Sequence, residues 1–335
     1  MQRILVIQLK RIGDFILTVP ALAALRAAKP TAEIVLLVPS AVADLAKCIP
    51  AVNRVIIYHL GRTNFETWSS AIAGEWDACL DFTGTDRSAL LTRLSQAKRR
   101  IGYAKFAGTG LRKMAYSELC EASVRQLHTV HFHQALVQQY IGDSSAMESA
   151  VLFRIPQSIQ TGAADKFAKA GLQGRFAVLH PGTAREEKFW LDERWADLAE
   201  HLHSRKQLAV VITGAGDGLE RPHLQQIKKS LRVPVIDLTG QLTLVELAVL
   251  LEKCELIVGV DSMAMHLASL LARPQVALFG PTNPFHWRPL HDRGIVLQGN
   301  SGEAAQVFTP LSSGCEMKLI STDDVIHAIE TLCTD

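Results

Sequence analysis

Short apolar runs alternate with amphipathic segments along most of the chain. Runs of Val, Ile and Leu without polar alternation are typical of strands buried on both faces, and helical segments between them predict a parallel sheet. In the first half the predicted strands are RILVIQL (3–9), EIVLLVP (33–39), RVIIYHL (54–60) and ACLDFTG (78–84), and the predicted helices cover 14–28, 41–48, 64–74 and 86–95.

The same alternation begins again in the second half of the chain. Between the halves, FRIPQSIQTG (about 153–162) brings Pro, Ser and Gly together and interrupts the pattern. A chain of 335 residues is long for one domain and suits two. We therefore predict an α/β protein of two Rossmann-like doubly wound domains, 1–157 and 158–335, and leave open whether the final helix packs back on the first domain. The strands predicted in the second half are 176–182, 208–216, 255–261 and 275–281.

Composition excludes several classes of protein. A net charge of +2 is too small to indicate a nucleic-acid partner. Six cysteines without a C-x-x-C pair indicate free thiols in a reducing compartment, not a disulfide framework or a zinc site. The first residues lack the pattern of a signal peptide, and no apolar run is long enough to span a bilayer. We therefore expect a cytoplasmic, soluble protein that can still touch a membrane surface.

Small and hydroxyl-bearing residues gather where the strands of the second half end. Such residues directly before helix N-termini offer backbone N–H groups to phosphate, and this favours a phosphate-bearing ligand on the second domain. A dinucleotide dehydrogenase needs G-x-G-x-x-G after a strand and a P-loop needs G-x-x-x-x-G-K-[ST], and the chain has neither. The strand ends concerned are 180–183, 213–217, 237–240, 261–266 and 279–284.

Several charged residues have two interpretations at this point. Lys10, Arg11 and Lys188 are candidate phosphate partners, although a lysine on the surface is more often only solvated. Asp14 follows the first strand and Asp261 precedes a helix, so each either caps its helix or faces a ligand.

Two further features are weighed in the same way. The spacing of His128, His131 and His133 invites a metal site, yet the segment has the pattern of an amphipathic helix without acidic partners, and we favour the helix. The stretch 87–113 is rich in Lys and Arg, and is either a solvated face or a surface for an anionic acceptor or lipid headgroups.

Three stretches in this order resemble the ADP-heptose:lipopolysaccharide heptosyltransferases of glycosyltransferase family 9. They are RILVIQLKRIGDFILTVPAL, LHPGTAREEKFWLDERWADLAEHL and IVGVDSMAMHLASLLARPQVALFGPTNPFHWRP. The resemblance covers nearly the whole chain, and the order of the three stretches makes it specific. It implies a GT-B fold whose two domains face each other across a cleft, the first holding the acceptor and the second the nucleotide-sugar. The HWRP element and the FW after Lys188 look most like the heptosyltransferase III branch, which adds a third, side-branch heptose.

The resemblance also implies a reaction and its residues. It implies inverting transfer of heptose from ADP-heptose to a lipopolysaccharide inner-core acceptor at the inner membrane face, with no metal or other cofactor required and no nucleic-acid partner. Asp14 would be the general base, and Lys188 would offset charge on the leaving ADP. Donor contacts are implied for Gly182, Thr183, Lys188, Glu220, Asp261, Ser262, Met263, Ala264, Met265 and His266, and acceptor contacts for Lys10, Arg11, Arg99 and Arg100.

Two residues depart from the pattern of the family. Met263 stands where many relatives have Gly, and Leu191 follows Trp190 where relatives often have Pro, which leaves the loop shape and the donor sugar open. The alternatives are a family member with another nucleotide-sugar or glycan acceptor, and a bilobed sugar-binding protein without catalysis. Asp14 together with Lys188 favours the enzyme.

Overall fold

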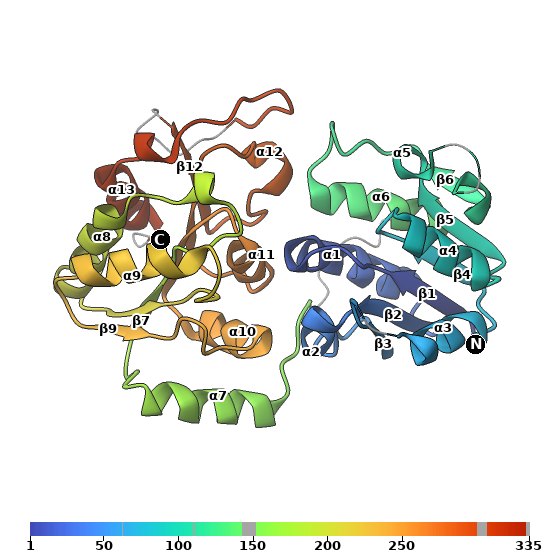
Figure 1. The fold of residues 1–335 in the computed structure, drawn as a ribbon, viewed down its shortest axis with the longest axis horizontal. Helices are drawn as coiled ribbons and strands as arrows, with labels where there is room; N and C mark the ends of the chain where they lie inside the picture. Colours follow the sequence, from blue (N-terminus) through green and yellow to red (C-terminus); the bar gives the residue numbers. More distant parts are fainter. Residues whose placement is uncertain (62, 109, 111, 143–151, 300–306, 333–335) are drawn as a thin grey trace. The chain divides into compact units, whose positions relative to one another are not determined.

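The computed structural model describes residues 1–61, 63–108, 110, 112–142, 152–299 and 307–332 of the chain. They form two compact units, the N-terminal unit (Met1–Arg154) and the C-terminal unit (Ile155–Asp335). The division between 154 and 155 lies close to the boundary predicted between 157 and 158, which lies in the first turn of α7 (Gln157–Lys169). Each unit has one parallel sheet with helices on both sides (Figure 1), which confirms the predicted fold class.

The N-terminal unit is built on a parallel sheet in the order β3-β2-β1-β4-β5-β6. This is the strand order of a Rossmann-type fold. The strands are β1 (Arg3–Ile7), β2 (Glu33–Pro39), β3 (Arg54–Tyr58), β4 (Ala78–Asp81), β5 (Arg99–Tyr103) and β6 (Glu118–Cys120). The helices are α1 (Ile12–Ala28), η1 (Ser40–Val42), α2 (Ala43–Ala46), α3 (Phe65–Ile72), α4 (Asp86–Leu94), α5 (Ala104–Ala107), η2 (Lys113–Ala115) and α6 (Thr129–Ile141).

Both faces of this sheet are covered. Leu5 and Ile7 of β1 pack with Ala71 of α3 and Leu91 of α4 in one apolar cluster. Successive strand residues point to opposite faces, so the wholly buried Ile4 lies on the other face, the side of α1 and α6, which pack against each other. Burial on both faces is the reason that β1 has no polar alternation.

The C-terminal unit repeats the same path of the chain. Its sheet has the order β12-β11-β10-β7-β8-β9, and its neighbouring strands are parallel. The strands are β7 (Phe176–His180), β8 (Ala209–Ile212), β9 (Val235–Asp237), β10 (Leu256–Val260), β11 (Gln275–Phe279) and β12 (Gly294–Gln298). The helices after α7 are η3 (Glu186–Lys188), α8 (Asp192–Ser204), α9 (Glu220–Ser230), α10 (Leu244–Lys253), α11 (Met263–Leu270), α12 (Pro284–Trp287), η5 (Met317–Leu319) and α13 (Thr322–Leu332).

The core of the C-terminal unit includes its last described helix. α13 packs on α8, β11 and β12, and its Val325 and Ile329 are wholly buried. They share one apolar cluster with Trp195 of α8 and Leu179 of β7. The last helix therefore belongs to the core of the C-terminal unit.

In both sheets the path of the chain reverses between two neighbouring strands, β1 and β4 in one unit and β7 and β10 in the other. Ligands of doubly wound folds bind beyond the carboxyl ends of the strands at this point. The segments that leave these strand ends are 8–14, 82–85, 181–188 and 261–266, and they contain most of the predicted site residues.

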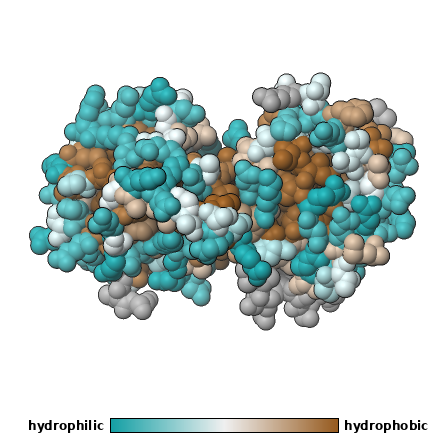
Figure 2. Space-filling model, turned by 90° about the horizontal axis from the view of Figure 1, so that it is seen from below, coloured by the Kyte–Doolittle hydropathy of each residue, from teal (hydrophilic) through white to brown (hydrophobic). Residues whose placement is uncertain are grey.

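No helix of the described ranges is long and apolar enough to cross a membrane. The face drawn in Figure 2 carries apolar side chains over a broad area of the N-terminal unit, on the right of the picture. Exposed large apolar residues of this unit include Leu60, Phe65 and Met114.

Candidate active site

Asp14 lies in the first turn of α1, just beyond the carboxyl end of β1. The helix begins at Ile12, its N-cap is Arg11, and no side-chain hydrogen bond caps it. Asp14 is therefore not the helix cap that the sequence left open. Lys10 and Arg11 are its positively charged neighbours, so the structure brings these three predicted site residues together.

Burial shifts the ionisation of this group of residues. It raises the pKa of Asp14, while the charges of Lys10 and Arg11 oppose the rise. It lowers the pKa of Lys10, while the charges of Asp14 and Asp81 oppose the fall. The Nζ of Lys10 lies 4.7 Å from the ring centroid of Phe106, over an aromatic face. A carboxylate with a raised pKa accepts a proton more readily, which suits a general base.

Hydrogen bonds hold the segment between β1 and α1 in place. Gln8 is wholly buried, and its Nε2 donates to the Oγ1 of Thr18 on α1 at 2.7 Å. The backbone N–H of Leu9 donates to the Oγ1 of Thr83, just after β4, also at 2.7 Å. These bonds fix the segment that carries Lys10 to both α1 and the end of β4.

Asp81 and His133 also lie near this group. The sequence offered His133 only as part of a metal site that we disfavoured, and the predicted site did not include Asp81. Asp81 accepts hydrogen bonds from the backbone N–H of Thr83 at 2.8 Å and from the hydroxyl of Tyr116 at 2.7 Å, and burial raises its pKa. The Nδ1 of His133 lies 2.9 Å from the hydroxyl of Tyr103. Burial lowers the pKa of His133 to about 3, so the ring is neutral. The sequence could have pointed to Asp81, because it ends the apolar run ACLD and a buried acid is rare at the end of such a strand.

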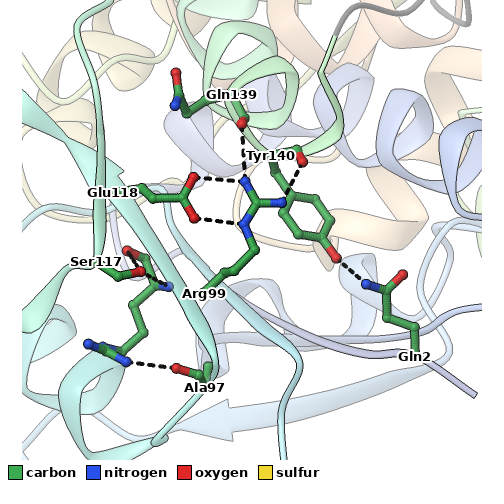
Figure 3. A network of polar contacts seen from close by, with 8 residues as sticks. Gln2, Ala97, Arg99, Ser117, Glu118, Gln139 and Tyr140 are labelled. Carbon is green, nitrogen blue, oxygen red and sulfur yellow. Dashed lines mark hydrogen bonds and ion pairs between the residues drawn. The ribbon is translucent and has the colours of Figure 1, made fainter.

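Arg99 and Arg100 lie at the opposite edge of the same sheet. Arg99 is the first residue of β5 and pairs in register with Ala78, the first residue of β4. Its guanidinium makes two hydrogen bonds to Glu118, at 2.6 and 2.7 Å, and one to the carbonyl of Tyr140 at 2.9 Å (Figure 3). Arg100 likewise donates to main-chain carbonyls. Both arginines hold the amino edge of the sheet together, and we leave them out of the proposed acceptor site.

In the C-terminal unit, Lys188 and Asp261 form a nearly buried ion pair. The Nζ of Lys188 is 2.6 Å from Oδ2 of Asp261, and the two side chains are only 13% and 7% exposed. Asp261 directly follows β10, and the N-cap of α11 is Ser262. Asp261 therefore pairs with the lysine and does not cap the helix. The pair brings two of the predicted donor residues together at the carboxyl edge of the sheet.

The N-terminus of α11 carries buried polar atoms without partners. Within the described ranges, Oγ of Ser262 and Nδ1 of His266 are buried and form no hydrogen bond, and the same holds for Oγ1 of Thr282, which follows the neighbouring strand β11. Burial lowers the pKa of His266, with Asp261 opposing the fall. Unsatisfied polar atoms beside a helix N-terminus fit a polar, anionic ligand.

Three other predicted donor residues form the start of the same helix. Met263 is its first residue and Ala264 and Met265 follow it. The backbone at Met263 does not adopt a positive φ. The family's Gly is therefore not needed for the backbone conformation at this position.

Gly182, Thr183 and Glu220 lie together beyond β7 and β8. Oε2 of Glu220 accepts a hydrogen bond from the N–H of Ala215 at 2.7 Å, and burial raises the pKa of Glu220. A Cβ on residue 182 would lie 2.4 Å from this Oε2, so the position of the carboxylate requires glycine there. Thr183 is buried beside it in the chain.

The histidine cluster does not form a metal site. His128 is the N-cap of α6, and its Nδ1 accepts from the N–H of Val130 at 3.2 Å. The described parts of the chain contain no group of three or more His, Cys, Asp or Glu side chains that could hold a metal ion.

The strand ends of both units thus carry acidic and basic groups suited to glycosyl transfer. Residues 66–314 match the model of a protein family described as Glycosyltransferase family 9 (heptosyltransferase). The chain belongs to glycosyltransferase family 9. This family 9 enzyme is 28% identical to lipopolysaccharide heptosyltransferase 1 of Pseudomonas aeruginosa over 296 residues, 84% of this chain and 79% of that protein. It is 22% identical to lipopolysaccharide heptosyltransferase 3 of Escherichia coli K12 over 334 residues, 96% of this chain and 95% of that protein.

Solved structures show the same fold. The fold of the family 9 enzyme superposes on a glycosyltransferase family 9 structure from Veillonella parvula with a TM-score of 0.86 and 23% identity, covering 99% of this chain and 97% of that one. For E. coli heptosyltransferase WaaC with ADP-2-deoxy-2-fluoro heptose, the TM-score is 0.73 at 22% identity, covering 98% and 99%. The enzyme is a glycosyltransferase with a GT-B fold. Relatives named heptosyltransferase 1 and 3 both match, so these likenesses do not separate the two branches.

Proposed function

We propose that this glycosyltransferase moves a heptose from ADP-heptose to a lipopolysaccharide inner-core acceptor, with inversion at the anomeric carbon. The names of its relatives support the sugar and the class of acceptor, and a structural neighbour binds an ADP-heptose analogue. The acceptor lies at the inner membrane face, where the enzyme works as a peripheral protein. Transfer of a side-branch heptose, as in heptosyltransferase III, is the branch we expect from the HWRP and FW elements.

The observation that carries the proposal is the partly buried Asp14 at the carboxyl end of β1, with its raised pKa. In our mechanism, the acceptor hydroxyl oxygen attacks the anomeric carbon while the bond from that carbon to the ADP oxygen breaks. Asp14 takes the proton of the hydroxyl as this happens. Lys10 and Arg11 bind negative groups of the acceptor, since both lie beside Asp14.

The C-terminal unit stabilises the leaving ADP in this mechanism. Lys188 and the N–H groups at the start of α11, from Ser262 to His266, offset the negative charge that builds on the diphosphate. Thr183 donates to a phosphate oxygen, and Glu220 accepts from the hydroxyls of the ribose. These groups supply the positive charge and donors that the departing ADP needs, so the mechanism requires no metal.

The test is a panel of truncated lipopolysaccharide cores incubated with the enzyme and ADP-heptose and analysed by mass spectrometry. We expect a gain of one heptose on a single core. Asp14→Asn should lower turnover by about 10²–10⁴-fold and leave ADP affinity within about twofold. The matched control is Asp44→Asn, because Asp44 is exposed on α2 of the same unit.

Three outcomes would contradict parts of the proposal. If no core gains a heptose while ADP binds, the donor or acceptor is a different sugar or glycan. If Asp14→Asn turns over as fast as Asp44→Asn, then Asp14 is not the base. If the wild type binds sugar nucleotide but never releases ADP, the chain is a binding protein.

A further inference from the structure

The lysine of the donor site directly follows an exposed stretch of its loop. Residues 184–187, between β7 and α8, are exposed, and η3 within this loop has no buried residue. Lys188 ends η3, and its side chain reaches Asp261 at the end of β10. A long, flexible side chain on such a loop loses much conformational freedom when it is held in one place. Some contact must therefore hold the loop.

The residue after Lys188 makes such a contact. The ring of Phe189 stacks on the imidazole of His223, with centroids 4.1 Å apart and planes 12° from parallel. His223 lies on α9, one turn after Glu220, so the two side chains share a face of the helix. The first turns of α9 thus contact the loop after β8 through Glu220 and the loop that carries Lys188 through His223.

His223 is itself fixed on its other side. Its Nδ1 lies 2.7 Å from Oδ1 of Asp192, the first residue of α8. Burial lowers the pKa of His223, so at neutral pH the ring is neutral and Nδ1–H is the donor to the carboxylate. The bond to Asp192 sets the plane of the ring, and the ring in turn supports Phe189. The imidazole therefore links α8 and α9 to the lysine loop.

We propose that His223 is a positioning residue of the donor site, which acts through Phe189 to keep Lys188 ready for the diphosphate of the sugar nucleotide. The role of Lys188 in this inference rests on the proposed function, whereas the contact between His223 and Phe189 does not. The stacked ring restricts Phe189, and the neighbouring Lys188 is thereby confined near Asp261. The ammonium is then already in place when the nucleotide binds, and less freedom is lost on binding.

The first experiment measures this confinement without a nucleotide. An amine-reactive reagent acylates Lys188, and peptide mass spectrometry measures the rate of this labelling. The rate is compared among the wild type, His223→Ala, His223→Phe and the matched control His203→Ala, whose histidine is exposed on α8. His223→Ala should raise the labelling rate of Lys188 about fivefold, from the energy of an aromatic pair. His223→Phe keeps the stacked face, and should stay within about twofold of the wild type, as should His203→Ala. An unchanged rate in His223→Ala overturns the proposal.

The second experiment tests the route by which His223 acts. ADP binding is measured by calorimetry for the wild type, His223→Ala, Lys188→Met and the double variant. We expect about fivefold weaker binding in His223→Ala, and no further loss when that change is added to Lys188→Met, because residues that act as a unit are not additive. The same fivefold loss in both backgrounds would show a general structural role and overturn the proposal.

The two experiments separate this inference from the proposed function. A wild type that does not bind ADP, but whose Lys188 labelling responds to His223→Ala, contradicts the proposed function and supports the positioning contact. A wild type that binds ADP, but whose labelling and binding ignore His223, keeps the proposed function and overturns the contact. Unfolding curves of each variant establish that a change in labelling is local.

Discussion

The ion pair of Lys188 and Asp261 makes Lys188→Met a strongly destabilising substitution in the C-terminal unit. The charged atoms are 2.6 Å apart, and the side chains are 13% and 7% exposed. Removing one partner of a buried pair typically costs about 3–5 kcal/mol, because the other charge stays buried without a counter-ion. Since both side chains keep slight exposure, we expect the lower end, a loss of about 3 kcal/mol in the free energy of unfolding.

Urea unfolding followed by tryptophan fluorescence measures this loss, because Trp190 and Trp195 report on the core of the C-terminal unit. The control is Lys47→Met. Lys47 pairs with Asp44 at 2.8 Å, but these side chains are 57% and 80% exposed. An exposed pair contributes little, so the control should lose less than about 0.5 kcal/mol.

A double variant tests the cause of the loss. Lys188→Met with Asp261→Asn removes the unpaired charge, and should recover more than half of the stability lost by Lys188→Met alone. The reasoning is refuted if Lys188→Met loses no more than Lys47→Met. In that case water or another group already neutralises Asp261, and burial of the pair has no energetic consequence.

Further predictions concern other described residues. Gly182→Ala should displace the Glu220 carboxylate, 2.4 Å from the new Cβ, and weaken ADP binding about tenfold by calorimetry; an unchanged ADP affinity would contradict this. Gly162→Ala in α7 has open space around the new Cβ, so it should raise the free energy of unfolding by about 0.5–1 kcal/mol. Arg99→Lys should lower the free energy of unfolding by about 1 kcal/mol through loss of the two-bond pair and leave turnover unchanged, and a tenfold fall in turnover at unchanged stability would restore an acceptor role. The pKa of His133 is about 3 in the folded chain against an ordinary value of 6.5, so below pH 6.5 the unfolded chain binds a proton that the folded chain does not. The free energy of unfolding, measured in urea, should therefore fall from pH 7 to pH 5.5, and should fall less in His133→Phe. Equal falls in the two proteins would contradict this.

The sequence predicted those parts of the fold that long apolar runs specify. Strands such as β1 and β7 are buried on both faces, so their runs are continuous and easily recognised. β5, with the sequence RRIGY, begins with two arginines, and β6 has only three residues. Such short or charged segments have no clear strand pattern, so both escaped prediction.

The missed β5 explains why its arginines were predicted to contact the acceptor. Without the strand, Arg99 and Arg100 were only part of a basic stretch, and nothing indicated that they begin a strand. All strands of a parallel sheet start at the same edge, and ligands bind at the edge where the strands end. A charge at the start of a strand therefore lies a full strand length from the ligand edge. The sequence alone therefore showed that this segment is basic, but not at which edge of the sheet its arginines lie.

Contacts between distant parts of the chain were also beyond prediction. Local pattern alone pointed to Asp14 and Asp261 at strand ends, but it left helix capping and ligand contact as alternatives for each. His223 meets Phe189 only because α9 packs beside the loop after β7, and the sequence between them does not encode that packing in any local signal. The pairing of Asp261 with Lys188, in place of helix capping, depends on the same kind of long-range contact.

The two units share one strand order, yet each has its own apolar core. A substitution within one apolar cluster repacks side chains of that unit. In the mechanism proposed above, the acceptor binds beside Asp14 and the sugar nucleotide beside Lys188, so natural selection can change the acceptor site while the donor site is kept. Under that proposal, an enzyme built in this way changes one half of its reaction at a time, which is an evolutionary route to new acceptors for the same donor.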